Sequence, residues 1–243
     1  MFQIAGEYYT LMLRVFRKPE KWGIFWKQFW FEAEKLIMAS IPLIFIISIF
    51  IGAVIVIQTA NNLVSPFIPK LYVGVMARES LVLEFCSTMV ALILAGKIGS
   101  NISSEIGSMR ITEQIDAMEI MGVNSANYLI LPKIAATTIF SPALMLFSFF
   151  IGVVGGGMII FFTEIITLAQ YVEGLRFAFH KWYIFYSMIK MAVFCFIITS
   201  LSAYYGYYAK GGSLGVGRSS TQAIVVSSSL ILVFDLALTK LLL

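Results

Sequence analysis

Five long apolar stretches limit this chain to a small number of folds. The first, residues 36–57, contains no charged side chain. A helix of about 20 apolar residues crosses the hydrocarbon core of a bilayer, and it satisfies its own backbone polar groups there. The other stretches cover residues 71–98, 134–162, 183–209 and 222–243. Because 60% of the residues are hydrophobic and only 12% are charged, we predict an all-α integral membrane protein with five transmembrane helices.

The N-terminal region, residues 1–35, combines aromatic and basic side chains before the first span. The aromatic residues at helical spacing are Trp22, Phe25, Trp26, Phe29 and Trp30. Aromatic rings with a polar tip and long basic side chains favour the headgroup layer of a membrane. We therefore predict an interfacial helix that lies on the membrane surface. The alternative interpretation is a tilted start of the first span.

The basic residues beside the spans predict the orientation of the chain. Those that precede the first span are Arg14, Arg17, Lys18, Lys21, Lys27 and Lys35. Because Lys and Arg gather on the cytoplasmic side of membrane proteins, we predict a cytoplasmic N-terminus and a C-terminus on the outer side. The polar stretches 96–133 and 210–220 are then cytoplasmic, whereas 58–69 and 163–182 face the other side. Five spans in one chain also suggest assembly into a symmetric homodimer.

The stretch 96–133 is the longest interior segment rich in charged and polar groups, and its centre has the pattern of a short amphipathic helix. The apolar residues that share one face at a period of about 3.6 residues are Ile111, Ile115, Met118 and Met121. The polar residues around the rest of the helix are Glu113, Gln114, Asp116 and Glu119. Gly122 is a typical C-terminal stop. A helix over 111–122, held between the second and third spans, is suited to receive force from a soluble partner.

The same segment resembles the signature of a known family. Glu-Gln-x-Asp-Ala-x-Glu-x-Met-Gly at 113–122, followed by Leu-Pro-Lys at 131–133, is similar to the signature of MlaE/YrbE permeases. Ala-Gly-Lys-Ile-Gly at 95–99 and Gly-x-x-Gly-Val-Gly-Arg at 212–218 agree with it. The resemblance covers nearly the whole chain, so we expect residues 1–243 to form a single permease domain.

The resemblance implies a function and a set of partners. Permeases of this family are membrane subunits of ABC transporters that carry phospholipid or related lipid between the inner and outer membranes of bacteria. It implies two copies of this chain in the inner membrane, a cytoplasmic ATPase dimer that holds ATP and Mg²⁺, and a periplasmic MCE-domain protein. Some such systems add a STAS-domain regulator. The 111–122 helix would couple the chain to the ATPase, and the chain itself would be a transport subunit that binds no cofactor.

Other functions find little support in the residue pattern. Gly212-x-x-x-x-Gly217-Arg218-Ser219 is a near miss for a phosphate-binding loop, but arginine replaces the lysine and no strand precedes it. ATP must therefore be hydrolysed by another chain. The single histidine, His180, cannot build a metal site or a catalytic triad alone. Nothing in the charge distribution suggests nucleic acid binding.

Arg78 and Glu79 are charged residues within the second span. A charge in hydrocarbon costs about 2.5 kcal/mol or more, so it needs a partner or a wet cavity. Neighbouring residues point about 100° apart on a helix, and we therefore predict that these two do not satisfy one another. The family resemblance places an Arg-Glu pair here, usually followed by Gly-Pro, whereas this chain has Ser80-Leu81. Structural ion pairing and lipid handling both remain open as roles.

A lipid needs an apolar path with a few polar groups near one end, and the second span combines these features. The residues expected to line this path are Arg78, Glu79, Leu81, Val82, Phe85, Met89 and, from the fourth span, Lys190. Two copies of the second span around a two-fold axis would enclose a central cavity. Lys190 and Asp235 in the fifth span could pair with one another or with Arg78 and Glu79, but snorkelling of Lys190 to the outer headgroups is slightly favoured.

Two further functions compete with lipid transport. An ion- or proton-coupled carrier would use Arg78, Glu79, Lys190 and Asp235, although no inverted repeat is visible. A non-transporting scaffold for a membrane complex is the other. Small residues recur at four-residue spacing along the second span, at Ala91, Ala95, Gly99, Ser103 and Gly107. Such a stripe permits close helix packing, and packing within one subunit is sufficient to explain it.

Overall fold

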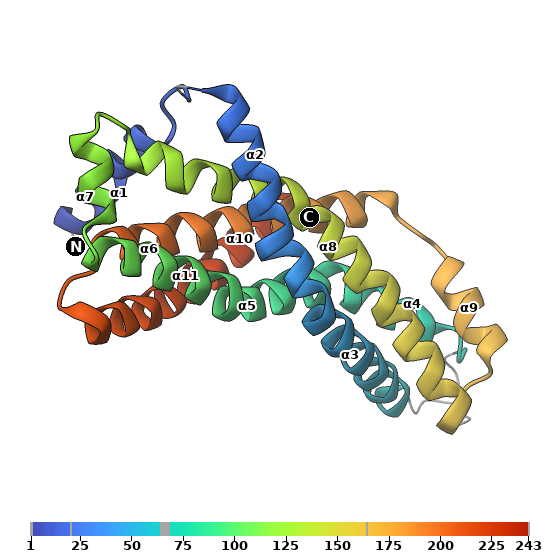
Figure 1. Ribbon diagram of the computed structural model, residues 1–243. Helices are drawn as coiled ribbons and strands as arrows, with labels where there is room; N and C mark the ends of the chain where they lie inside the picture. Colours follow the sequence, from blue (N-terminus) through green and yellow to red (C-terminus); the bar gives the residue numbers. More distant parts are fainter. Residues whose placement is uncertain (1, 20, 64–68, 164, 243) are drawn as a thin grey trace.

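The computed structural model describes residues 2–19, 21–63, 69–163 and 165–242, and the regular elements in this part of the chain are helices (Figure 1). The helical segments long and apolar enough to cross a membrane are Trp22–Asn62, Tyr72–Ile111, Ser125–Thr163, Lys181–Tyr207 and Gly212–Leu242. The prediction of an all-α membrane protein with five transmembrane helices is confirmed. Residues 64–68 of the predicted outer loop 58–69 lie outside the described residues.

The N-terminal region contains two helices, α1 (Phe2–Val15) and α2 (Trp22–Glu32). A π-helical turn (Ala33–Ile37) and a short 3₁₀ turn (Met38–Ser40) carry α2 directly into α3 (Ile41–Asn62). The aromatic helix is therefore continuous with the first span, as the alternative interpretation expects. Its residues Trp22 and Trp26 are about half exposed, and Trp30 is 61% exposed.

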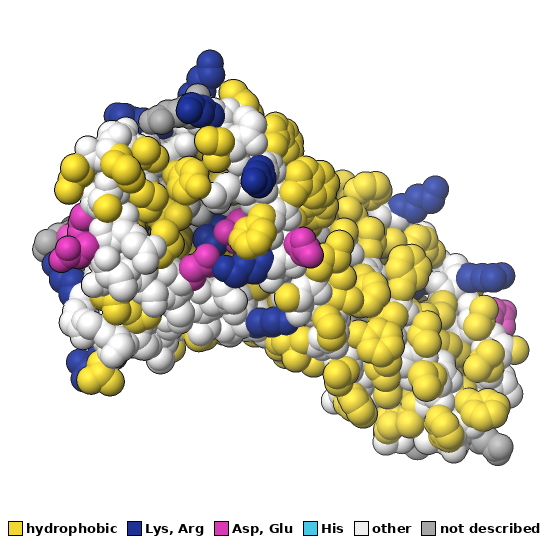
Figure 2. Space-filling view, in the orientation of Figure 1, with side chains coloured by type: hydrophobic (Ala, Val, Ile, Leu, Met, Phe, Trp, Pro, Cys, Tyr) yellow, Lys and Arg dark blue, Asp and Glu magenta, His cyan; other side chains and the backbone are white. Residues whose placement is uncertain are grey.

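Close packing of α3 against α8 (Ser125–Thr163) forms one half of the molecule (Figure 1). A side chain on Gly52 would collide with the backbone of Gly152, and one on Gly155 would collide with the backbone of Ile49. The hydroxyl groups of Ser48 and Ser148 form a hydrogen bond of 2.8 Å between the two helices. Small residues thus bring the two backbones together, as in other membrane helix pairs. Hydrophobic side chains cover most of the face of this half that Figure 2 shows.

The second span contains the longest π-helical segment among the described residues. It consists of α4 (Tyr72–Ser80), α5 (Val90–Leu94) and α6 (Ser100–Ile111), joined by π-helical segments at Leu81–Met89 and Ala95–Gly99. The small-residue stripe along it is buried against α10 (Lys181–Tyr207) and α11 (Gly212–Leu242). A side chain on Gly99 would meet the hydroxyl of Ser202 at 2.9 Å, and one on Gly107 would meet Val216 at 3.1 Å. The stripe therefore serves packing within the subunit.

The span boundaries differ from the prediction at the end that holds α1 and α7 (Gln114–Ile120). The second span continues to Ile111 instead of ending near 98, and the third begins at Ser125 instead of 134. The fourth span ends at Tyr207, and the fifth begins at Gly212, inside the predicted turn 210–220. The second, third and fifth spans extend beyond their apolar stretches because a helix satisfies its own backbone groups in water as well as in hydrocarbon.

The opposite end of the molecule is closed by α9 (Leu168–Arg176) beside α4 (Figure 1). A capping box begins this helix: the Thr167 hydroxyl accepts from the Gln170 amide, and the Gln170 side chain accepts from the Thr167 amide. The Tyr171 hydroxyl donates to the carbonyl oxygen of Val153 at 3.2 Å. Burial raises the pKa of this phenol above its ordinary value. α9 is thus a fixed cover on α4 and α8.

Candidate functional site

The predicted 111–122 helix is shorter in the structure and spans Gln114–Ile120. It cannot continue from α6, because Glu113 adopts a left-handed backbone conformation with a φ of 61°. Gly122, with a φ of 80°, ends it. The amide of Val123 donates to the Met118 carbonyl at 3.0 Å, and that of Gly122 donates to the Glu119 carbonyl at 3.0 Å. These paired bonds are a Schellman motif, so the predicted stop at Gly122 is confirmed.

The apolar residues of this segment do not share one buried face. Ile115 is fully buried and Met118 is partly buried, whereas Ile111, Ile120 and Met121 are 36%, 88% and 71% exposed. The single-face prediction is wrong for Ile111 and Met121, because both lie outside the seven-residue helix. These exposed apolar side chains lie at the end of the molecule that holds α7, and Glu113 and Gln114 of the same segment are also exposed (Figure 1).

Two carboxylates attach α7 to the spans. Asp116 accepts a hydrogen bond from Arg110 of α6 at 2.5 Å. Glu119 accepts from the Tyr207 hydroxyl at 2.8 Å and from the Ser125 hydroxyl at 3.1 Å. These partners stand at the end of α6, the end of α10 and the start of α8. A displacement of α7 therefore acts on three spans at once.

A charged cluster missed in the sequence lies just inside this end. Lys133 of α8 donates to Glu32 at 2.5 Å and to Glu105 of α6 at 2.8 Å, and Lys35 contacts the other Glu105 oxygen at 2.8 Å. Lys133 and Glu32 are almost fully buried, and Glu32 Oε2 has no hydrogen-bond partner among the described atoms. Acidic and basic side chains gather in a hollow beside the α2–α3 helix (Figure 2). In the sequence, the one feature that points to this cluster is Glu32, a charged residue that interrupts an aromatic run.

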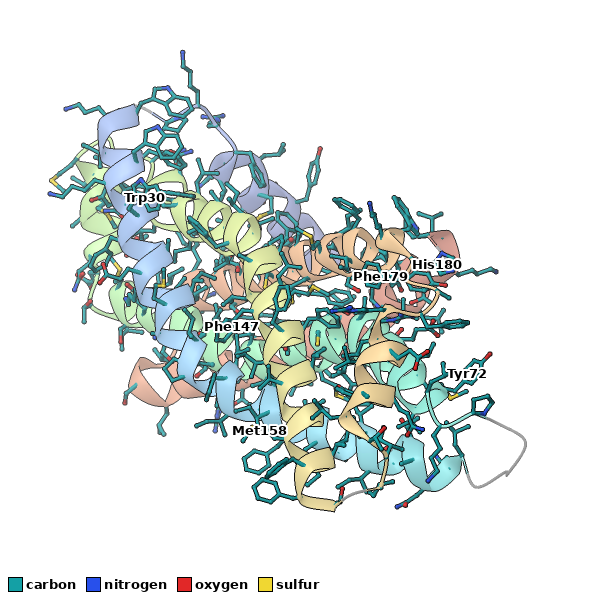
Figure 3. The ribbon with its side chains drawn as sticks, turned by 90° about the vertical axis from the view of Figure 1, so that its right-hand side faces the viewer. Trp30, Tyr72, Phe147, Met158, Phe179 and His180 are labelled. Atoms are coloured by element: carbon teal, nitrogen blue, oxygen red, sulfur yellow. The ribbon has the colours of Figure 1, made fainter. Side chains whose placement is uncertain are left out.

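Arg78 is buried and holds the segment that follows α9. Its guanidinium donates to the carbonyl oxygens of Leu175 at 3.0 Å, Phe177 at 2.8 Å and Ala178 at 3.4 Å. The ring of Phe179, beside His180 at the start of α10 (Figure 3), lies 5.5 Å from it. Ala178 has a φ of 49°, so this fixed turn carries backbone strain.

The structure pairs Arg78 with its sequence neighbour. The distance from Arg78 Nη2 to Glu79 Oε1 is 3.1 Å, and the Glu79 side chain is 37% exposed. The prediction that these residues do not satisfy one another is wrong, because the long arginine side chain reaches across the angle between two helix positions. The contacts of Arg78 are thus one ion pair and three hydrogen bonds to backbone carbonyl oxygens, all within the chain.

Lys190 is fully buried and does not snorkel. Its ammonium lies 2.5 Å from Asp235 and 3.2 Å from Glu84, and it also donates to the Leu83 carbonyl at 3.1 Å. The Thr88 hydroxyl lies 2.9 Å from Asp235 and 3.2 Å from Glu84. The expected snorkelling is wrong, and the alternative of pairing with Asp235 is confirmed. Glu84 completes the cluster, although it was not among the predicted site residues.

The predicted lipid-path residues divide between the interior and the surface of the chain. Leu81 and Val82 are 1% and 2% exposed, and Leu81 packs beside Gly152 of α8. Phe85 is partly buried, and Met89 is 44% exposed. The residues of the π-helical segment Leu81–Met89 that remain at least partly accessible are therefore Leu83, Glu84, Phe85 and Met89. Within the described residues, no group of three His, Cys, Asp or Glu side chains is placed to hold a metal ion.

Apolar spans with paired charges between them, and a short helix tied to three spans at one end, have the build of a helical membrane permease. The family described as Permease MlaE matches residues 29–241. The chain belongs to this family. The resemblance inferred from the 113–122 run is confirmed, and the protein is a multi-pass membrane transport subunit.

Individual relatives support the assignment. A probable ABC transporter permease protein of Rickettsia bellii is 34% identical over 209 residues, covering 83% of this chain and 78% of the relative. One from Synechocystis is 32% identical over 178 residues, covering 73% of this chain and 67% of the relative. An Arabidopsis thaliana protein, TRIGALACTOSYLDIACYLGLYCEROL 1, chloroplastic, is 28% identical over 237 residues, covering 98% of this chain and 65% of the relative. Kinship with ABC transporter permeases implies an ATPase partner.

Proposed function

We propose that this chain is the membrane subunit of an ABC transporter that moves a phospholipid or a related lipid, driven by an ATPase on a separate chain. Its place among the MlaE permeases supports this function, and one relative carries a lipid, trigalactosyldiacylglycerol, in its name. The observation that carries the coupling is α7, which has exposed apolar side chains and contacts to three spans.

We further propose an orientation and a set of partners. The end formed by α1 and α7 carries Arg14, Arg17, Lys18 and Lys21, which favours the cytoplasmic side of a bacterial inner membrane. The C-terminus then faces the periplasm, where an MCE-domain protein would receive or deliver lipid. Two copies of the chain would form the transporter, with an ATPase dimer that holds ATP and Mg²⁺. A STAS-domain regulator would act on that ATPase in some systems.

In this proposal the ATPase binds the tip of α7. Ile120 and Met121 would enter an apolar groove, and Glu113 and Gln114 would meet its rim. Asp116 and Glu119 face the permease in the structure, so they would transmit the movement instead of binding the partner. This division of roles refines the set of coupling residues expected over 111–122.

Replacing Ile120 with aspartate should detach the ATPase without unfolding the permease. Loss of an apolar anchor costs about 2 kcal/mol or more at a protein interface, which is roughly thirtyfold in affinity. Co-purification of the ATPase and lipid-stimulated ATP hydrolysis should both fall by that order, while the melting temperature stays unchanged because Ile120 is 88% exposed.

The matched control is Leu214→Asp, a substitution of another exposed apolar residue, at the start of α11. It should leave both measurements near wild type. Full ATPase co-purification by Ile120→Asp would contradict docking at α7. Transport that follows pH and ignores ATP would favour the ion-coupled carrier, and the absence of any transport would favour a scaffold.

Arg78→Ala separates lipid handling from structural pairing. Because the guanidinium supplies the donors for the turn after α9, we expect the melting temperature to fall, by the equivalent of about 2 kcal/mol, and Arg78→Lys to restore it only in part. Glu79→Gln, which keeps the guanidinium contacts with the backbone, is the control. A stable Arg78→Ala complex that retains less co-purified lipid would instead assign Arg78 to the lipid path.

A further inference from the structure

A cavity of about 710 Å³ lies between the end of α1, the start of α2 and the corner from α7 to α8. Four cations line it: Arg14, Arg17, Lys18 and Lys21. None of them forms an ion pair with another described residue. All four side chains are exposed to solvent, which screens part of their mutual repulsion, and an anion in the cavity would lower the rest. The cavity therefore has the electrostatics of an anion-binding site.

Hydrogen bonds to the backbone fix the wall that carries these cations. Asn127 of α8 is almost fully buried and donates to the carbonyl oxygens of Val15 at 2.7 Å and Arg17 at 2.6 Å. Asn124 donates to the Arg14 carbonyl at 3.1 Å. The backbone from Arg14 to Arg17 is thus held at the start of α8, and the two arginine side chains extend from this fixed backbone. A pre-organised wall lowers the entropy cost of binding.

The acidic lining residue that the structure describes, Glu119, offsets one of the four positive charges. Glu119 uses one carboxylate oxygen to accept from both Tyr207 and Ser125, which lie on the other side of α7. The remaining polar groups of the lining include the Gln28 amide and the Tyr128 hydroxyl, which bond to one another at 2.7 Å. With four cations and one carboxylate, the described lining keeps a net positive charge of three.

The surroundings identify the source of the anion. Arginine and lysine together favour a phosphate, which accepts forked hydrogen bonds from a guanidinium and charge from an ammonium. Ile24 and Phe25 of α2 line the cavity, and Trp22 and Trp26, which are about half exposed, stand beside them on the same helix. Aromatic rings of this kind mark the headgroup level of a bilayer. The cavity volume lies in the range of about 300–1,000 Å³ that small-molecule sites occupy.

We propose that this cavity binds the phosphate ester of an anionic membrane lipid, with its headgroup among the four cations and its chains beside α2. The bound lipid would fix α1 and α2 against the corner that carries α7. This site is separate from the predicted lipid path along Leu81–Met89. It requires only that this end of the chain meets a membrane surface, and it does not depend on the direction or the cargo of transport.

The test compares short-chain lipids on the purified full-length chain in detergent. Dioctanoyl phosphatidylglycerol should bind about tenfold more tightly than dioctanoyl phosphatidylcholine, counted by native mass spectrometry and checked by a rise in melting temperature. Arg17→Gln combined with Lys21→Gln should abolish this preference. Lys27→Gln combined with Lys210→Gln removes the same charge outside the cavity lining, and it should leave the preference within about twofold of wild type.

Each other outcome has a defined meaning. Equal binding of the two lipids, or an equal loss in both double variants, would overturn the site. Glycerol 3-phosphate that binds as tightly as phosphatidylglycerol would keep the phosphate chemistry but overturn the lipid as its source. An Arg17→Gln and Lys21→Gln variant that keeps the lipid preference but no longer co-purifies an ATPase would show a protein-docking surface instead. Failure of the transport proposal itself would leave the lipid preference intact, so the two are distinguishable.

Discussion

Replacing Lys190 with methionine is expected to destabilise the protein by about 3–5 kcal/mol, the usual cost of removing one partner from a buried ion pair. Methionine is similar in length, so the change removes mainly the charge. Asp235 and Glu84 would then face each other across the Thr88 hydroxyl without their cation. Unfolding in detergent, followed by circular dichroism, measures the loss.

Neutralising the two carboxylates as well should restore part of the stability that Lys190→Met removes. Adding Asp235→Asn and Glu84→Gln to Lys190→Met removes every charge of the cluster and should restore more than half of the lost stability, since neutral replacements of buried ion pairs are often tolerated. If the triple variant is as unstable as Lys190→Met, packing around Lys190 is the cause. If Lys190→Met alone is as stable as wild type, the cluster is not needed for the fold.

The number of spans could be predicted from the sequence, but their ends could not. Hydropathy reports where a helix meets hydrocarbon, and this signal fades at Ile98 and reappears at Ile134. The helices themselves continue to Ile111 and begin at Ser125, because intrahelical hydrogen bonds do not depend on the surrounding solvent. The prediction therefore assigned too much of the stretch 96–133 to a separate cytoplasmic segment.

The sequence also could not show which residues pair with the buried charges of Arg78 and Lys190. The cost of burying Lys190 could be predicted, but its partner Glu84 lies 106 positions away in the chain. Arg78 bonds mainly to backbone carbonyl oxygens, which every residue possesses and no sequence pattern marks. The segment 111–122 shows the same limit, because a helical wheel over it assumes a continuous helix, and Glu113 breaks that helix.

Gly155→Val should separate α3 from α8 and destabilise the protein by about 3 kcal/mol, the upper end of the usual range for overpacking. A side chain at this position collides with the backbone of Ile49, and backbone cannot move aside as a flexible side chain can. The cysteine pair Ser48→Cys and Ser148→Cys reports the separation, because the two hydroxyls lie 2.8 Å apart in the wild type. Disulfide formation should be rapid without Gly155→Val and slow with it.

The matched control is two positions along the same glycine run. A β-carbon on Gly157 first meets another residue, Tyr171, at 3.9 Å, which is ordinary van der Waals contact. Gly157→Val carries the same change in helix propensity and the same added volume, so it corrects for both. We expect it to keep fast cysteine pairing and most of the stability. Equal losses in the two variants would mean that helix propensity, and not the close approach of α3 and α8, sets the requirement for glycine.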